Sequence, residues 1–256
     1  MTKTVLITGG TGKVGTQIVQ HFFKKGLNII FIAKEQKETN LLIKKIKKIY
    51  NNLTNQIFGL ATNLIKKNFH KKVIELLNDK KISPNYLINC VRNLDFLKIG
   101  SDGITQRQEW LGELTLDVIV PYELSMALAN QENCKLEHII NISSMYGIVP
   151  PNPFLYNKPE IESPIQYGVA KAAQIHLTKE LAIRLAPQNI RVNSISFGGI
   201  EGRVNEEFKK KYAQLCPLKN MLKKEEIIGA IDFLASNKSV GMTGHNLVVD
   251  GGWTVW

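Results

Sequence analysis

Three polar side chains in the second half of the sequence could transfer a proton together. Tyr167 and Lys171 are four residues apart, so a helix would place them one above the other on the same face. A free tyrosine has a pKa of about 10 and is a poor acid or base near neutrality, but a neighbouring ammonium stabilises its phenolate. Ser144 follows a predicted strand at 137–143, and at the end of that strand its hydroxyl could hold a substrate oxygen. These residue types predict acid–base chemistry on a carbonyl or an alcohol.

A glycine-rich turn near the N-terminus predicts a site for a dinucleotide. The apolar run Val5–Thr8 leads into Gly9-Gly10-Thr11-Gly12-Lys13-Val14-Gly15, and the pattern predicts a helix over residues 13–25. The turn has the spacing Gly-x-Gly-x-x-Gly between a strand and a helix, which is the context that this fingerprint requires. Glycines allow backbone N–H groups to approach a pyrophosphate, and the helix presents its positive N-terminal end to the same phosphates.

The next predicted strand bears on the choice between the two nicotinamide cofactors. The fingerprint is usually followed, about 20 residues later, by an acidic residue that binds the ribose 2′-hydroxyl, and Glu35 stands at that distance. However, the strand itself ends at Ala33, and Lys34 follows it. Lys34 and Lys13 could both face a 2′-phosphate, which favours NADP and leaves NAD as the alternative.

Short β-branched stretches alternate with longer amphipathic stretches along the whole chain. Strands are predicted at residues 5–8, 28–33, 56–60, 86–89, 137–143, 190–196 and 246–250, and helices at 13–25, 36–50, 64–78, 108–130, 165–186 and 224–236. Strands separated by helices require crossover connections, which predicts an α/β fold with a mostly parallel sheet. Because no repeat or composition break divides the chain, residues 1–256 are interpreted as a single domain.

The net charge of +11 raises the question of a nucleic-acid partner. Residues 1–100 carry 18 basic and 5 acidic side chains, so the surplus lies in the first part of the chain. The basic residues are 28 lysines and 5 arginines, whereas specific nucleic-acid readers favour arginine. Since the lysine pairs recur at helical spacing beside apolar residues, we interpret them as solvated helix faces and expect no nucleic-acid partner.

Composition also argues against membrane, metal and disulfide chemistry. No apolar run approaches the roughly 18 residues that a membrane span needs, and the first residues lack the apolar segment of a signal peptide. The three cysteines, Cys90, Cys134 and Cys216, are widely spaced, so neither a zinc site nor a disulfide framework is expected. The resulting expectation is a cytoplasmic protein with no metal and no membrane partner.

Five motifs follow one another along almost the whole chain. They are Thr8-Gly9-x-x-Gly12-x-x-Gly15, Ile142-Ser143-Ser144-x-x-Gly147, Tyr167-Gly168-Val169-Ala170-Lys171, Arg191-Val192-Asn193-Ser194-Ile195-Ser196-x-Gly198 and Thr243-Gly244-x-Asn246-Leu247-Val248-Val249-Asp250-Gly251-Gly252. In this order they resemble the single-domain type of the short-chain dehydrogenase/reductase family. The resemblance implies a Rossmann-like, doubly wound, seven-stranded sheet with helices on both faces. It also implies an NAD(P)-dependent oxidoreductase that interconverts a carbonyl and an alcohol on a small-molecule substrate.

The resemblance further implies roles for individual residues. Ser144, Tyr167 and Lys171 would be catalytic, and Asp117 aligns with the family's helical asparagine, which shapes a proton relay. Besides Tyr167 and Lys171, the residues implied at the cofactor are Gly9, Thr11, Gly12, Lys13, Val14, Gly15, Lys34, Asn63, Asn89, Cys90, Gly198 and Ile200. A homodimer or homotetramer built through the helices at 108–130 and 165–186 is implied as well.

The sequence departs from the family's pattern at residues expected in the proton relay and in the substrate pocket. Arg92 stands where the family usually has a glycine, and it either points at an anionic ligand or turns to solvent. An ionised Asp117 would change the electrostatics of the relay. Residues 150–164 hold five of the nine prolines, and we expect this stiff loop to form part of the substrate pocket. The predicted substrate residues are Arg92, Tyr146, Phe154 and Tyr156.

The sequence is compatible with two functions. The glycine spacing, the long loop and Arg92 resemble relatives that act on sugars or sugar nucleotides, including those in surface-polysaccharide pathways. The alternative is a catalytically impaired NADP-binding sensor or scaffold, which the altered loop at 89–92 and Asp117 would favour.

Overall fold

Seven strands pair in parallel to form one sheet in the computed structural model, which describes residues 2–202 and 204–255. The order across the sheet is β3-β2-β1-β4-β5-β6-β7. The strands are β1 (Thr4–Thr8), β2 (Asn28–Ala33), β3 (Ile57–Ala61), β4 (Tyr86–Asn89), β5 (His138–Ser144), β6 (Arg191–Phe197) and β7 (Asn246–Val249). The predicted α/β class with a doubly wound, seven-stranded sheet is confirmed, and all pairs of neighbouring strands are parallel.

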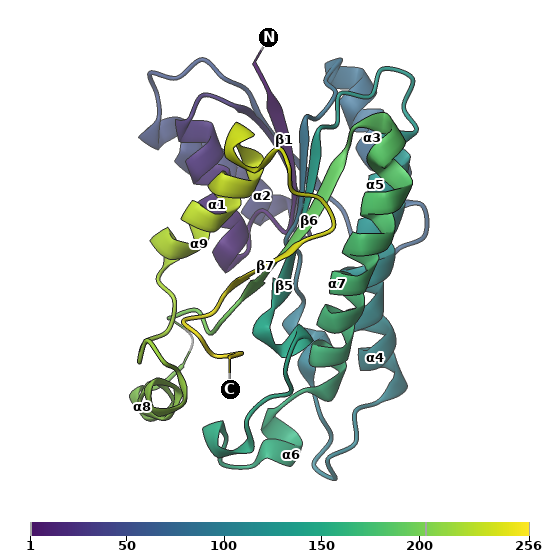
Figure 1. The fold of residues 1–256 in the computed structure, drawn as a ribbon. Coiled ribbons are helices and arrows are strands. Elements are labelled where there is room, and N and C mark those ends of the chain that lie inside the picture. The colour runs from purple at the N-terminus through teal and green to yellow at the C-terminus, as the bar shows by residue number, and fades with distance from the viewer. Residues whose placement is uncertain (1, 203, 256) are drawn as a thin grey trace.

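Helices cover both faces of the sheet (Figure 1). α1, α2 and α9 lie on one face, and α3, α4, α5 and α7 lie on the other, whereas α6 and α8 lie beyond the carboxyl ends of the strands. The helices are α1 (Lys13–Lys24), α2 (Gln36–Ile49), α3 (Phe69–Lys80), α4 (Arg107–Leu114), α5 (Val120–Ala129), α6 (Pro159–Glu162), α7 (Ile165–Leu185), α8 (Glu206–Leu215) and α9 (Lys224–Ala235). Across the described residues, none of the helices combines the length and apolarity needed to cross a bilayer.

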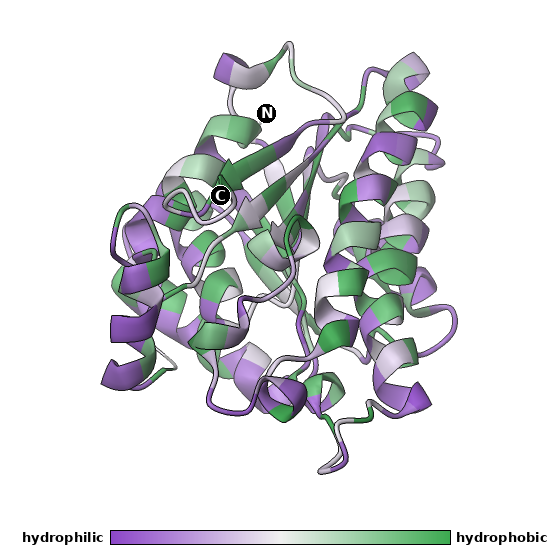
Figure 2. Ribbon diagram, turned by 60° about the horizontal axis from the view of Figure 1, so that its bottom comes forward, coloured by the Kyte–Doolittle hydropathy of each residue, from purple (hydrophilic) through white to green (hydrophobic). Residues whose placement is uncertain are grey.

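Strand side chains alternate between two apolar cores, one on each face of the sheet. Ile7 belongs to the core beneath α1, α2 and α9, whereas its neighbour Leu6 belongs to the core beneath α3, α5 and α7. Both side chains are fully buried. Figure 2 shows hydrophobic strands between helices whose outer faces are largely hydrophilic. Burial on both faces explains why the strands read as continuous apolar runs in the sequence.

The strand order changes direction beside β1, and this change fixes where the site forms. β2 and β3 lie on one side of β1, and β4 to β7 lie on the other. In a doubly wound sheet, ligands bind outside the carboxyl ends of the strands at such a switch point. The loops that follow β1 and β4 meet there so closely that a Cβ added to Gly9 would lie 2.7 Å from the Cα of Val91.

The helix predicted over residues 108–130 is interrupted by a π-helical turn at Thr115–Ile119. Pro121 has no N–H to donate to the carbonyl of Asp117, so the regular ladder cannot continue. The N–H of Val120 instead reaches the carbonyl five residues earlier, which widens the helix by one residue. The turn therefore separates α4 from α5 and contains Asp117.

Candidate active site

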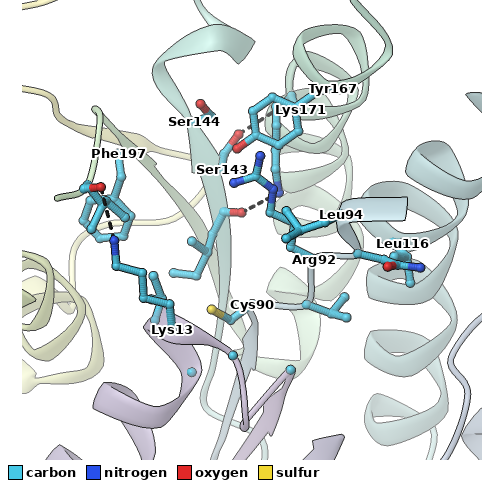
Figure 3. Close-up of a pocket in the computed structure, with 18 of the residues that line it drawn as sticks. Lys13, Cys90, Arg92, Leu94, Leu116, Ser143, Ser144, Tyr167, Lys171 and Phe197 are labelled. Atoms are coloured by element: carbon cyan, nitrogen blue, oxygen red, sulfur yellow. Dashed lines mark hydrogen bonds between the residues drawn. The ribbon is translucent and has the colours of Figure 1, made fainter. Parts of the chain in front are cut away.

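A cavity of about 820 Å³ opens at the carboxyl ends of the strands, beside the switch point. The segments that follow β1, β2, β4, β5 and β6 line it, together with the start of α7 (Figure 3). The predicted site residues that line it are Gly9, Thr11, Gly12, Lys13, Val14, Gly15, Lys34, Asn63, Cys90, Arg92, Ser144, Tyr146, Tyr156, Tyr167, Lys171, Gly198 and Ile200. The fold thus brings most of the predicted cofactor, catalytic and substrate residues to one place.

Asn89, Asp117 and Phe154 are the predicted site residues that do not line the cavity. Asn89 and Asp117 are buried behind its wall. The Phe154 side chain is 80% exposed, because the short helical turn at Pro153–Leu155 directs the neighbouring Leu155 into a core instead. The expected place of Phe154 in the substrate pocket is therefore not what the structure shows.

The turn after β1 brings backbone groups, rather than side chains, to the cavity. Gly9 has a φ of +71°, in the left-handed region that favours glycine. A Cβ added to Gly15 would lie only 2.1 Å from the carbonyl oxygen of Gly9. The N-cap of α1 is Gly12, so no side-chain cap occupies the first N–H groups of that helix. Those groups can bind an anion at the mouth of the cavity.

The two lysines predicted at a 2′-phosphate have different surroundings. Lys34 directly follows β2, and its exposed side chain lines the cavity. Lys13 Nζ instead donates to the carbonyls of Ile200, at 3.2 Å, and Glu201, on the β6 side of the cavity (Figure 3). Lys13 therefore ties α1 to the loop after β6, in contrast to the expectation that both lysines face one phosphate. Glu35 does not line the cavity within the described residues.

α7 carries Tyr167 and Lys171 one turn apart, and Lys171 Nζ lies 5.8 Å from the centre of the Tyr167 ring. Its three hydrogens have three acceptors, Asp117 Oδ1 at 2.8 Å, the Ile142 carbonyl at 2.9 Å and Gln174 Oε1 at 3.4 Å. Burial opposes the charge of the ammonium, but the Asp117 carboxylate, with contributions from Tyr167 and Glu113, outweighs burial and holds the pKa of Lys171 above its ordinary value. The result is a buried ion pair directly beneath Tyr167.

A second buried carboxyl lies next to this ion pair. Glu113 is one helical turn before Asp117, near the end of α4, and only 2% of it is exposed. Burial raises the pKa of Glu113 to about 7, and the negative charge of Asp117 acts in the same direction. The Glu113 carboxyl is therefore partly protonated near neutrality. Sequence reasoning missed it, because a glutamate in a helix without clear amphipathic periodicity gives no signal of burial.

Arg92 reaches over the cavity to the ring of Tyr167. Its Cζ lies 4.7 Å from the centre of that ring, within the range of a cation–π contact. Figure 3 shows the guanidinium beside the Tyr167 ring. Of the two orientations left open by the sequence, the structure has the one that turns Arg92 into the cavity.

Ser144 and the tyrosines of the following loop form another wall. Ser144 Oγ accepts a hydrogen bond from the Tyr146 N–H at 3.2 Å, which orients the hydroxyl so that its hydrogen can be donated to a substrate oxygen. The hydroxyls of Tyr146 and Tyr156 bond each other at 2.9 Å, and burial raises the pKa of both. Neither hydroxyl releases a proton readily, which disfavours both tyrosines as the acid–base group.

Cys90 and Asn89 contribute to the structure around the cavity rather than to its chemistry. Burial raises the pKa of the Cys90 thiol to about 12, so no thiolate nucleophile forms near neutrality. The Cys90 N–H donates to Thr8 Oγ1 at 3.0 Å, which holds the loop after β4 against β1. Asn89 Nδ2 donates to Asn141 Oδ1 at 2.8 Å within the sheet.

Sequence reasoning also missed the wall formed by the segment after β6. α8 places Phe208 and Tyr212 against the cavity. Their spacing of four residues in an otherwise polar segment was the available signal, since it puts both rings on one face of a helix. The Tyr212 hydroxyl accepts a hydrogen bond from the Gly199 N–H at 2.9 Å, so α8 is fixed to the loop after β6.

Comparisons with known proteins extend over the whole chain. A family profile described as enoyl-(acyl carrier protein) reductase matches residues 11–254. The post-translational flagellin modification protein A of Campylobacter coli is 30% identical over 273 aligned positions, which cover 98% of each chain. The probable galactose dehydrogenase of Rhizobium meliloti (strain 1021) is 28% identical, with 97% of this chain and 93% of that protein covered. A crystal structure of a short chain dehydrogenase from Leptospira borgpetersenii with bound NAD+ has a TM-score of 0.84 at 29% identity, covering 99% of this chain and 93% of that one.

Gly15→Ala should disrupt the glycine turn, because the new Cβ would meet the Gly9 carbonyl oxygen at 2.1 Å. We expect the free energy of unfolding in urea to fall by about 1–3 kcal/mol, together with the affinity for a dinucleotide. The control is Gly229→Ala in α9, where nothing lies within 4 Å of an added Cβ. That variant should gain about 0.5–1 kcal/mol and keep its cofactor affinity. Equal losses in both variants would contradict the argument from close contact.

Glu113→Gln should remove a pH-dependent loss of stability. Because the pKa of Glu113 is raised from 4.5 to about 7, its neutral form stabilises the fold fully below 4.5, and this contribution is lost as the pH rises through about 7. Glutamine is neutral throughout, so the variant should become more stable than the parent as the pH rises from about 5 to about 8, by up to about 3 kcal/mol. Urea denaturation at both pH values measures the difference. The exposed Glu132→Gln is the control, and an effect of Glu113→Gln that does not change with pH would refute the assignment.

Proposed function

Because the chain belongs to the short-chain dehydrogenase/reductase family, it is an NAD(P)-dependent oxidoreductase that acts on CH–OH groups, and we propose that its substrate is a sugar or a nucleotide sugar. In this proposal the enzyme interconverts a carbonyl and an alcohol on that substrate, as a step in the synthesis of a surface polysaccharide or another surface glycan. The observation that carries it is the convergence of Ser144, Tyr167 and the glycine turn on one cavity.

The turn after β1 fits a nicotinamide dinucleotide. Gly9 and Gly15 keep open a cradle that side chains would fill, and the uncapped start of α1 offers N–H groups to a pyrophosphate. Gly198 and Ile200 line the opposite side of the cavity, next to Ser144. When bound, the nicotinamide would supply or accept the hydride.

The protein's own residues would handle the proton. Ser144 donates its hydroxyl hydrogen to the substrate oxygen and so holds the reacting carbon in place. In the direction of reduction, the Tyr167 phenol gives its proton to that oxygen, and in the direction of oxidation the phenolate takes the proton back. Positive charge near the ring stabilises the phenolate, which is the role of the cations around Tyr167.

The lining of the cavity supports a substrate with several hydroxyl groups. Tyr156 and Asn93 offer polar groups at its edge, and Arg92 adds a cation that could also meet a phosphate. Phe208 offers an apolar surface on which the C–H face of a sugar ring could pack. The names of two relatives agree with this class, since one modifies flagellin and the other is called a probable galactose dehydrogenase.

A second candidate is an NADP-binding sensor or scaffold with impaired turnover. The observation that favours it is the Lys171–Asp117 ion pair, because an ammonium neutralised by a carboxylate at 2.8 Å acts more weakly on Tyr167. Reduced cofactor that binds but is not oxidised by any carbonyl in a metabolite screen would support this candidate over the enzyme.

We also propose that the protein forms a homodimer or homotetramer through the faces of α4, α7 and the π-helical turn. Apolar side chains on these elements are exposed, namely Leu111 at 53%, Ile119 at 47% and Val169 at 45%. A second copy packed against them would remove this apolar surface from water. The oligomeric mass in solution, measured by light scattering, tests this arrangement.

Tyr167→Phe should abolish most of the turnover while it leaves the fold and the cofactor site in place. The change removes one hydroxyl and little volume, so NADPH binding and thermal stability should be kept. Turnover of a carbonyl substrate found by the screen should fall by about 10²–10⁴-fold, as expected for a lost general acid or base. Tyr122→Phe, a partly exposed tyrosine on α5, is the matched control. Full activity in Tyr167→Phe would end the assignment.

NADPH should bind more tightly than NADH, because Lys34 follows β2 at the edge of the cavity and Glu35 does not line it. One charge-assisted contact to a 2′-phosphate corresponds to about 1.5–3 kcal/mol, or roughly a tenfold to hundredfold preference. Titration calorimetry should show that Lys34→Ala reduces this preference, whereas Lys37→Ala on α2 leaves it intact. A lower dissociation constant for NADH in the parent protein would overturn the preference for NADP.

A further inference from the structure

We propose that Arg92 is a positioning residue that supplies the cationic field acting on Tyr167, in the place of an ammonium whose charge Asp117 has balanced. The inference rests on the proposed role of Tyr167 as the acid–base group. It assigns to Arg92 an action on the phenol, rather than on the substrate alone.

The first observation is that the Lys171 ammonium is fully engaged. Its three hydrogens are donated to the carboxylate of Asp117, the carbonyl of Ile142 and the amide oxygen of Gln174. Lys171 and Asp117 have side chains that are only 7% and 4% exposed, so water screens neither charge. Seen from the Tyr167 ring, the pair is close to a neutral dipole.

The second observation is that Arg92 lies nearer to the same ring. Its Cζ is 4.7 Å from the ring centre, compared with 5.8 Å for Lys171 Nζ. Arginine stays charged under all ordinary conditions and stacks well on aromatic faces. An opposite charge within about 4–6 Å shifts an acid towards its ionised form by about one to three pKa units. Arg92 therefore places a positive charge against the ring that carries the phenol, where it can stabilise a phenolate.

The sum of the charges around Tyr167 is consistent with the proposed role of Arg92. The charged and titratable groups around it and its partners are Lys171 of α7, Asp117 of the π-helical turn, Glu113 of α4, Cys90 and Arg92 of the loop after β4, and Tyr146 and Tyr156 of the loop after β5. With Cys90 and the two tyrosines neutral, the sum is +1 while Glu113 is protonated and zero once Glu113 ionises above a pH of about 7. Without Arg92 each sum would be lower by one, so no net positive charge would face the phenol at either pH.

The test measures the ionisation of Tyr167 directly and needs no substrate. The chain has 7 tyrosines, so the phenolate absorbance of each variant is titrated against the same variant carrying Tyr167→Phe, and the difference belongs to Tyr167. Arg92→Met keeps an unbranched side chain but removes the guanidinium and its charge, and it should raise the titration midpoint by about one to three pH units, or about 1.4 kcal/mol per unit. Arg92→Lys should restore most of that change.

A double substitution separates the electrostatic role from a structural one. Asp117→Asn removes the carboxylate that balances the Lys171 charge. The Tyr167 midpoint should therefore fall when this change is made in the parent, and it should return towards the parent value when the change is added to Arg92→Met. An unchanged midpoint in Arg92→Met, or no rescue by Asp117→Asn, would overturn the inference. If Arg92→Met does not fold, the titration of Asp117→Asn alone still tests the inference. A Tyr167 midpoint that does not fall in Asp117→Asn would mean that the ion pair does not mask the charge of Lys171, and it would overturn the inference.

The outcome is also distinct from a failure of the proposed function. A shifted midpoint without turnover of any carbonyl would uphold the role of Arg92 and refute the enzyme activity. If Arg92→Met keeps the parent's kcat and the parent's Tyr167 titration midpoint and raises only KM, then Arg92 binds the substrate instead of acting on Tyr167.

Discussion

The parallel pairing of β1 between β2 and β4 is the constraint on which the site depends. Because the three strands run in one direction, their carboxyl ends meet at the same edge of the sheet, and the segments that follow them share one cavity. The turn after β1 and the loop after β4 can approach only where no side chain intervenes, as the 2.7 Å from a Cβ on Gly9 to Val91 shows. A slip of one residue would exchange Leu6 and Ile7 between the two cores. The apolar cores therefore fix the register that makes glycine necessary at position 9.

The buried Lys171–Asp117 pair is a second constraint, and it connects the helices to the chemistry. Two charges removed from water are tolerated only when each is well paired and hydrogen-bonded. The π-helical turn before Pro121 carries Asp117, and the end of β5 supplies the Ile142 carbonyl. The pair therefore joins the helical layer to the strand that ends in Ser144. It holds Tyr167 over the cavity whether or not it stabilises the fold as a whole.

The sequence allows the fold and most of the cavity to be predicted, because those features depend on local patterns. Strand periodicity, glycine spacing and the four-residue step from Tyr167 to Lys171 are all visible within a few residues. The direction of Lys13 is not, since its acceptor at Ile200 lies 187 residues away in sequence. The burial of Glu113 and the exposure of Phe154 escape prediction for a related reason. Each depends on how a neighbouring segment packs, and residue type and spacing do not report it.

Backbone groups form one side of the cavity and side chains form the other. Family membership therefore indicates more about the first side than about the second. The cofactor side consists of backbone at a glycine turn and a helix N-terminus, which the fold itself dictates. The other side, where we propose that the substrate binds, consists of side chains from the loop after β5 and from α8. Tyr156 joins them, because its hydroxyl bonds Tyr146 and its ring meets Phe208 edge to face at 5.9 Å. A relative with the same sheet keeps the first half almost automatically, whereas a few substitutions at these aromatic residues remodel the second. Family membership therefore establishes a nicotinamide-dependent reaction, and the identity of the substrate must be read from the aromatic wall.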